Sequence, residues 1–361
     1  SHAEGQGLDA FAAGMILLGG GGSLVMTNSM PLAFIVLPKH IPLVMTLCNC
    51  LFDASAVMFL LLYRVYAAGV ERRTMFVAYA LLCAAVHIAL SLAWCGPPAA
   101  RLREAKAAEP PLHGLPLKRQ LCSFEFAFAV IFLSLQQFRS NTYLGTNKEV
   151  LEKLGDASTG YFYTQAFSAS LPASLVCVPL ISRCLRDRGF ADTFLLTSIL
   201  GILWNGVALV QSLPAQLVSF AAFTNFRAFL YSAYFTFVAH SFGSRTSASV
   251  SGVIGVFSGS LNFMIWPCTE LSQQVGGLSS LYWALLLLSL PPLVLSGLLK
   301  RRLQRLPSSD CRVAAALNNN SRNKNNSNNN NDNDNDNNNN DNDNNNDNNN
   351  EKESNSDRNR T

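Results

Sequence analysis

Charged side chains are scarce in this sequence of 361 residues: Asp, Glu, Lys and Arg make up 14% of it, whereas hydrophobic residues make up 49%. Soluble domains usually carry about a quarter of their residues as charges. Many of the polar residues lie in one C-terminal segment, residues 318–350, which is almost entirely Asn and Asp. The rest of the chain is apolar enough to indicate a membrane protein.

The sequence also lacks the motifs of several functional classes. None of its nine cysteines forms a CxxC pair, and several lie in apolar runs, where cysteine is usually a small packing residue. No metal-binding, nucleotide-binding or catalytic constellation is present, so we expect no metal, no cofactor and no enzyme activity. Basic residues form no groove with interleaved aromatics, so we expect no nucleic-acid partner.

Apolar runs long enough to cross a bilayer occupy most of the chain. A membrane-spanning helix needs about 20 mostly apolar residues, and these runs are too long for barrel strands. The sequence therefore predicts an all-α, polytopic protein in a lipid bilayer. The nine expected spans cover about residues 8–33, 41–65, 74–95, 123–146, 160–182, 190–212, 214–239, 246–270 and 278–299.

The loops predict an orientation and a division of the chain. With the C-terminus in the cytoplasm, the inside connections hold fourteen Lys and Arg residues and the outside connections hold five. The longest connection follows the third span. We therefore expect a partial N-terminal bundle (1–95), a cytoplasmic loop (96–122), a six-helix C-terminal bundle (123–305) and a cytoplasmic tail (306–361), disordered because it lacks apolar residues.

Two expected spans carry an arginine: Arg227 lies at the middle of its span, and Arg139 lies nearer the end of its span, from where it could also extend toward the membrane surface. A charge within a span is costly unless it faces the bundle interior or a water-filled cavity. In each span the arginine belongs to a polar stripe on one helix face. The stripes are Thr224, Arg227, Tyr231 and Tyr234 in one span, and Gln136, Arg139, Tyr143 and Asn147 in the other.

One carboxylate accompanies these two arginines. Asp53 lies on a third stripe with Thr46 and Asn49, and it can neutralise at most one arginine. A bound carboxylate would complete the pairing, because the planar guanidinium matches a carboxylate through two parallel hydrogen bonds. The alternative is that an arginine holds structure, by bonding to helix carbonyls or to Asp53. Asp53 could equally serve ion coupling or structural pairing.

Several stretches together resemble a known family. Asp187-Arg188-Gly189 is similar to a loop element of the major facilitator superfamily. Within it, the chain resembles the facilitative large neutral amino acid transporters, a group that includes an equilibrative nucleobase transporter and has relatives in fungi and apicomplexan parasites. The matching stretches are GGGGSLVMTNSMPL, CLFDASAVMFLLLYRVYAAG, LKRQLCSFEFAFAVIFLSLQQFRSNTYLGTNKEVLEKL and VSFAAFTNFRAFLYSAYF.

The resemblance implies that the nine spans correspond to helices four to twelve of a twelve-helix transporter, so that three helices of the family pattern appear absent. It implies alternating access around a midplane substrate. We expect Arg227 to hold the carboxylate of a neutral or aromatic amino acid, with Arg139 on the facing helix. Tyr143 and Tyr231 would shape the pocket, with Asn147 and Thr224 as further contacts.

Two alternatives stay open at this point. The chain could carry a nucleobase or another small metabolite on the same scaffold. It could also be a non-transporting fragment or scaffold whose Asn/Asp tail recruits partners. For a transporter we expect the plasma membrane rather than a vacuolar or other internal membrane.

Overall fold

A computed structural model describes residues 10–29, 40–94, 112 and 115–305, which belong to one compact unit ending at Arg305. All regular structure in these residues is helical, and they contain no strand. Five helical stretches are long and apolar enough to cross a membrane. The expectation of an all-α, polytopic membrane protein is confirmed. The predicted tail and most of the predicted 96–122 loop lie outside the described residues.

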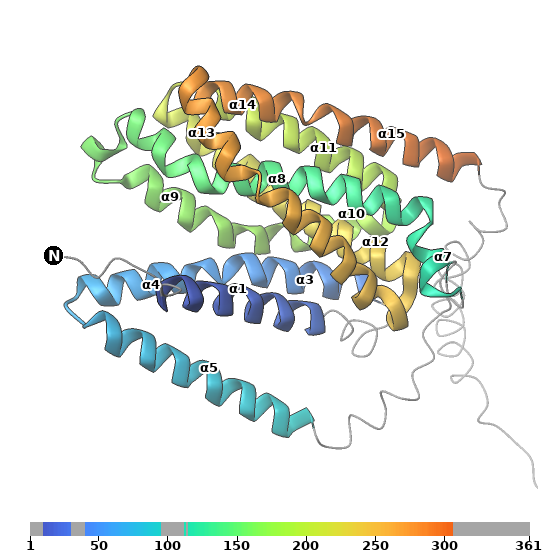
Figure 1. Cartoon of the computed structure of the whole chain (residues 1–361), viewed down its shortest axis with the longest axis horizontal. Helices are drawn as coiled ribbons and strands as arrows, with labels where there is room; N and C mark the ends of the chain where they lie inside the picture. The colour runs from blue at the N-terminus through green and yellow to red at the C-terminus, as the bar shows by residue number, and fades with distance from the viewer. Residues whose placement is uncertain (1–9, 30–39, 95–111, 113–114, 306–361) are drawn as a thin grey trace, which may run out of the picture. The chain divides into compact units, whose positions relative to one another are not determined.

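Each of the nine expected spans contains helix in its described part (Figure 1). Several spans are built from two or three consecutive helices rather than one. The elements are α1 (Ala10–Ser29), α3 (Ile41–Ala54), α4 (Ala56–Ala67), α5 (Arg72–Trp94), α7 (Leu117–Leu121), α8 (Phe124–Lys153), η2 (Asp156–Thr159), α9 (Phe162–Ser170), η3 (Leu171–Cys177), α10 (Val178–Asp187), α11 (Gly189–Ala208), α12 (Leu213–Asn262), α13 (Ile265–Val275), α14 (Leu278–Leu287) and α15 (Leu290–Arg305).

Two prolines explain why the fifth expected span is not one continuous α-helix. The span made by α9, η3 and α10 tightens into a 3-10 segment over Leu171–Cys177, with Pro172 at its start and Pro179 just after its end. Proline lacks the backbone N–H that would continue the α-helical hydrogen bonds, and its ring clashes with the preceding turn. One side of this irregular segment packs against α3, and Ser174 there is fully buried.

The seventh and eighth expected spans meet at a sharp turn at Gly243. This residue has φ 78° and ψ 172°, a backbone conformation that is essentially restricted to glycine. Residues on both sides of the turn, including Ala239 and Ser247, line one small cavity. The two halves of α12 therefore fold back on each other, as two spans joined by a tight connection require.

Aromatic side chains fill the core between α8, α11 and α12. Phe128 meets Phe194 and Phe237 with ring centroids 5.0 and 5.7 Å apart, and Trp204 of α11 is fully buried beside Tyr143. Helix α3 packs against α12, α10 and η3. This packing brings the predicted third stripe, which contains Asp53, onto the face of α12 that carries Arg227.

A buried carboxylate outside the expected spans fixes the start of α9. Asp156 accepts hydrogen bonds from the backbone N–H groups of Tyr163 and Thr164, at 3.0 and 2.9 Å, and from the hydroxyls of Thr159 and Thr164, both at 2.7 Å. Burial raises the pKa of this carboxyl, but the hydrogen bonds outweigh it, so the pKa lies below its usual range. Asp156 therefore caps the first turn of α9.

We predict that Asp156→Asn destabilises the protein at neutral pH by about 2 kcal/mol, because an amide offers one acceptor where four donors converge. The folded-state pKa is lowered, so the carboxylate stabilises the fold above the unfolded-state pKa of about 4. That contribution is lost as pH falls through the folded-state pKa. Thermal unfolding in detergent should therefore show a difference between wild type and variant at pH 7 that shrinks in acid. Asp187→Asn, at an exposed pair with Arg186, is the control and should change little.

Candidate functional site

An ion pair joins Arg227 of α12 to Asp53 of α3. The Arg227 Nη2 donates to the Asp53 Oδ1 at 2.8 Å, and the two side chains are 11% and 7% exposed. The residues are 174 positions apart in the sequence. Helix α3 therefore places Asp53, the carboxylate of its polar stripe, beside Arg227 at the middle of the seventh expected span.

Three further side chains complete the surroundings of Arg227. Its Nη1 donates to the Ser140 hydroxyl of α8 at 3.3 Å. The Tyr231 and Phe223 rings lie with their centroids 5.3 and 5.9 Å from the guanidinium carbon, within the range of a cation–π interaction. The Nε of Arg227 is buried and has no hydrogen-bond partner among the described residues. The Nε–H of the arginine is thus still available as a donor.

This geometry settles which arginine Asp53 accompanies. Pairing makes the Arg227 site close to neutral as a whole, because one guanidinium faces one carboxylate at hydrogen-bonding distance. A charged ligand at this point would have to displace or share Asp53. An uncharged ligand would not.

Arg139 makes a different set of contacts. It is fully buried, and it donates to backbone carbonyls of two other helices: Nε to Leu285 of α14 at 2.9 Å and Nη2 to Gly201 of α11 at 2.7 Å. Its Nη1 donates to the Oε1 of Gln136. Leu285 lies in the last turn of α14, where helix carbonyls lack an intrahelical partner. These contacts favour a structural role for Arg139, linking α8, α11 and α14.

Tyr143 and Asn147 lie along the same inward face of α8 and are almost fully buried. Tyr143 packs between Trp204 and Phe223 and its hydroxyl pairs with that of Ser219 at 3.1 Å. The Oδ1 of Asn147 has no hydrogen-bond partner in the described part of the chain. Among the described residues, neither side chain bonds directly to Arg227 or Asp53, and Tyr143 reaches the surroundings of Arg227 through the Phe223 ring.

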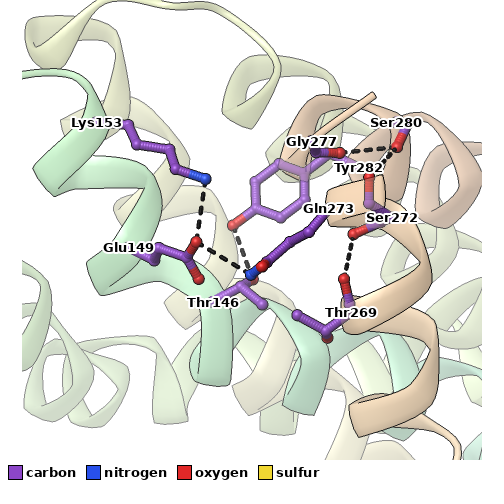
Figure 2. Close-up of polar contacts among 9 residues, drawn as sticks. All are labelled: Thr146, Glu149, Lys153, Thr269, Ser272, Gln273, Gly277, Ser280 and Tyr282. Carbon is purple, nitrogen blue, oxygen red and sulfur yellow. Dashed lines mark hydrogen bonds and ion pairs between the residues drawn. The ribbon is translucent and has the colours of Figure 1, made fainter. Parts of the chain in front are cut away.

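The end of α8 is anchored to the hairpin between α13 and α14, as Figure 2 shows. The Thr146 hydroxyl lies 3.2 Å from that of Tyr282, and the Glu149 carboxylate accepts from Lys153 at 3.0 Å and from Gln273 at 3.2 Å. These contacts extend the interhelical bonding that begins at Arg139. They indicate that this face of α8 holds the C-terminal helices together.

A different face of α8, the one that carries Gln137 and Ser140, contacts Arg227. A role for these two residues was not predicted from the sequence. Ser140 and Gln137 lie one turn apart on that face, and the Gln137 Oε1 accepts a hydrogen bond from Ser258 in the second half of α12 at 2.6 Å. The stretch SLQQFRS is polar on both faces, so periodicity alone could not choose between them. The sequence feature that could have indicated this second face is the spacing of Gln137 and Ser140, which lie one helical turn apart.

Thr224 lies one turn before Arg227 and lines a half-open cavity of about 170 Å³ between α12 and the α9–η3 segment. Its hydroxyl is 3.2 Å from that of Ser170. The other lining residues are mainly small or apolar, apart from Asn225. The candidate site therefore centres on Arg227, Asp53, Tyr231 and Ser140, and Thr224 lies one turn away on α12.

Comparison with known proteins finds one distant similarity. The chain is 22% identical over 314 residues to equilibrative nucleobase transporter 1 of Bos taurus, an alignment that covers 70% of this chain and 64% of that protein. The chain thus spans less than two thirds of the relative's length. No protein-family model matches the chain, and no solved structure matches it.

Proposed function

We propose that this protein is a membrane transporter whose cargo is a small uncharged heterocycle of the nucleobase class. Many solute transporters are polytopic helical proteins with ionisable side chains between their helices, and this protein shares both features. The cargo is moved without chemical change, so the site needs groups that bind rather than catalytic groups. The plasma membrane is the membrane we propose for it.

The observation that carries the choice of cargo is the pairing of Arg227 with Asp53. Because the charge of Arg227 is already met at 2.8 Å, the site does not require an anionic group from the cargo. An uncharged ring that stacks on Tyr231, which is only partly buried, and exchanges hydrogen bonds with polar side chains fits such a site. The similarity to a nucleobase transporter points to the same class of cargo.

Neutral and aromatic amino acids are the second candidate. The observation in their favour is the unpartnered Nε of Arg227, an N–H group that a carboxylate can accept. Binding an amino acid in this way would place a second carboxylate near Asp53. Repulsion between the two carboxylates opposes that arrangement, which ranks amino acids below nucleobases.

Uptake competition separates the two. Cells that express the full-length gene product should accumulate labelled adenine, and excess unlabelled adenine or uracil should block the uptake. Excess leucine or tyrosine should leave it unchanged. Uptake of labelled leucine or tyrosine that adenine does not inhibit would support the amino acid alternative instead. Absence of uptake of any of these solutes by correctly inserted protein would contradict the transporter proposal.

A further inference from the structure

Two carboxamide side chains, those of Gln137 and Asn49, lie one helical turn from the Arg227–Asp53 pair, and each has a hydrogen-bonding group without a partner among the described residues. Helices α8 and α12 run antiparallel, because Ser140 meets Arg227 while Phe128 meets Phe237. Gln137, one turn before Ser140, therefore lies level with Tyr231, one turn after Arg227.

Helix α3 reaches the same level from its own side. It also runs antiparallel to α12, because Asp53 pairs with Arg227 while Met45 packs with Ala239. Asn49, one turn before Asp53, shares the face of α3 that carries this carboxylate. Gln137, Tyr231 and Asn49 thus come from three helices to one level of the protein.

The Gln137 carboxamide is fixed in one orientation. Ser258 donates to its Oε1 at 2.6 Å, which directs the Nε2 amino group away from that contact. Gln137 is only partly buried, and its Nε2 makes no hydrogen bond within the described ranges. Gln137 therefore presents a donor whose position is set by a neighbouring helix.

Asn49 supplies the complementary group. Its Nδ2 donates to the Met45 carbonyl of its own helix at 2.9 Å. Its Oδ1 is buried and has no partner among the described residues, although the residue is only 3% exposed. A buried polar atom left without a hydrogen bond is costly, so an acceptor kept in this state points to a ligand that donates to it.

Building on the proposed function, we infer that Gln137 and Asn49 select the cargo by its hydrogen-bonding edge. Gln137 would donate to a ring acceptor, and Asn49 would accept from an exocyclic amino group or ring N–H. An edge with an acceptor next to a donor is what adenine offers at N7 and its 6-amino group. The Tyr231 ring lies at the same level and can pack on the face of the heterocycle.

The test measures the inhibition of labelled adenine uptake by unlabelled adenine and by purine, which lacks the 6-amino group. In wild type, purine should bind about tenfold more weakly than adenine, the factor expected for one hydrogen bond. In Asn49→Leu, adenine should lose this advantage while purine binding stays unchanged. An adenine-to-purine ratio that is the same in variant and wild type would overturn the role of Asn49.

A second pair of variants tests Gln137 without depending on Asn49. Gln137→Met should raise the KM for adenine about tenfold, and Ser258→Ala, which frees the amide to rotate, about threefold. Ser260→Ala is the matched control, because Ser260 lies on the same helix, is exposed, and its hydroxyl donates only to the Val256 carbonyl of that helix. Unchanged KM values in both Gln137→Met and Ser258→Ala would overturn the inference.

The outcome for the wild type separates this inference from the proposed function. If wild type takes up adenine and the variants do so with unchanged KM and selectivity, the inference fails and the transporter proposal stands. If folded, correctly inserted wild type takes up no nucleobase, the proposed function fails, and the inference fails with it. Surface abundance and gel filtration of each variant show that it is folded.

Discussion

Replacing Asp53 with asparagine is expected to destabilise the protein by about 3 kcal/mol. The substitution leaves the Arg227 guanidinium without a counter-charge where both side chains are about nine-tenths buried. Removing one partner of a buried pair is costly because the remaining charge cannot return to water. The expected loss is a large fraction of the stability of a typical protein.

The measurement is the midpoint of thermal unfolding in detergent, together with the yield of monodisperse protein. Asp192→Asn is the matched control: Asp192 also pairs with a basic residue, Lys300, but both side chains are more than a third exposed. The control should change stability by less than about 1 kcal/mol. Equal effects of the two substitutions would mean that the Arg227–Asp53 pair is hydrated and does not organise the site.

Replacing Gly201 with alanine is the second change with a large expected effect. A Cβ at this position would lie 3.1 Å from the Arg139 Nη1 and 3.2 Å from the Phe226 ring. Arg139 is held by three hydrogen bonds and cannot move without breaking them. Overpacking of this kind costs about 1–3 kcal/mol, and we expect the upper part of that range.

Gly206→Ala on the same helix is the control, because a Cβ there meets nothing within 4 Å. Alanine has the higher helix propensity, so this control should leave stability unchanged or raise it slightly. If Gly201→Ala were as well tolerated as Gly206→Ala, α11 would not lie against Arg139. The structural role assigned to Arg139 would then be wrong.

Hydropathy located the helical regions of this protein but not where single helices begin and end within them. Nine apolar runs predicted nine spans, and helix is found in each of them within the described residues. The interruption near Pro172 and the connection near Gly243 could also be anticipated, because proline and glycine impose local backbone conformations whatever surrounds them. The predicted division into bundles and the role of the tail stay predictions.

The partner of each polar side chain could not be predicted from helical period alone. The stripe containing Arg139 is real, but its partners are carbonyls of Gly201 and Leu285, which any sequence would provide. A carbonyl becomes available through helix ends and close approach, which depend on the tertiary packing. Ser140 and Gln137 lie one position along from the predicted stripe and face Arg227 and Ser258 instead.

The central claim is that Arg227 and Asp53 neutralise each other, and a double-mutant cycle on unfolding free energy tests it most directly. The cycle compares Arg227→Gln, Asp53→Asn and the double variant with wild type in detergent. The account predicts that the double variant is more stable than the sum of the single losses implies, with a coupling energy of about 2 kcal/mol or more. Additive losses, with coupling near zero, would contradict it and return Arg227 to a site that awaits an anionic cargo.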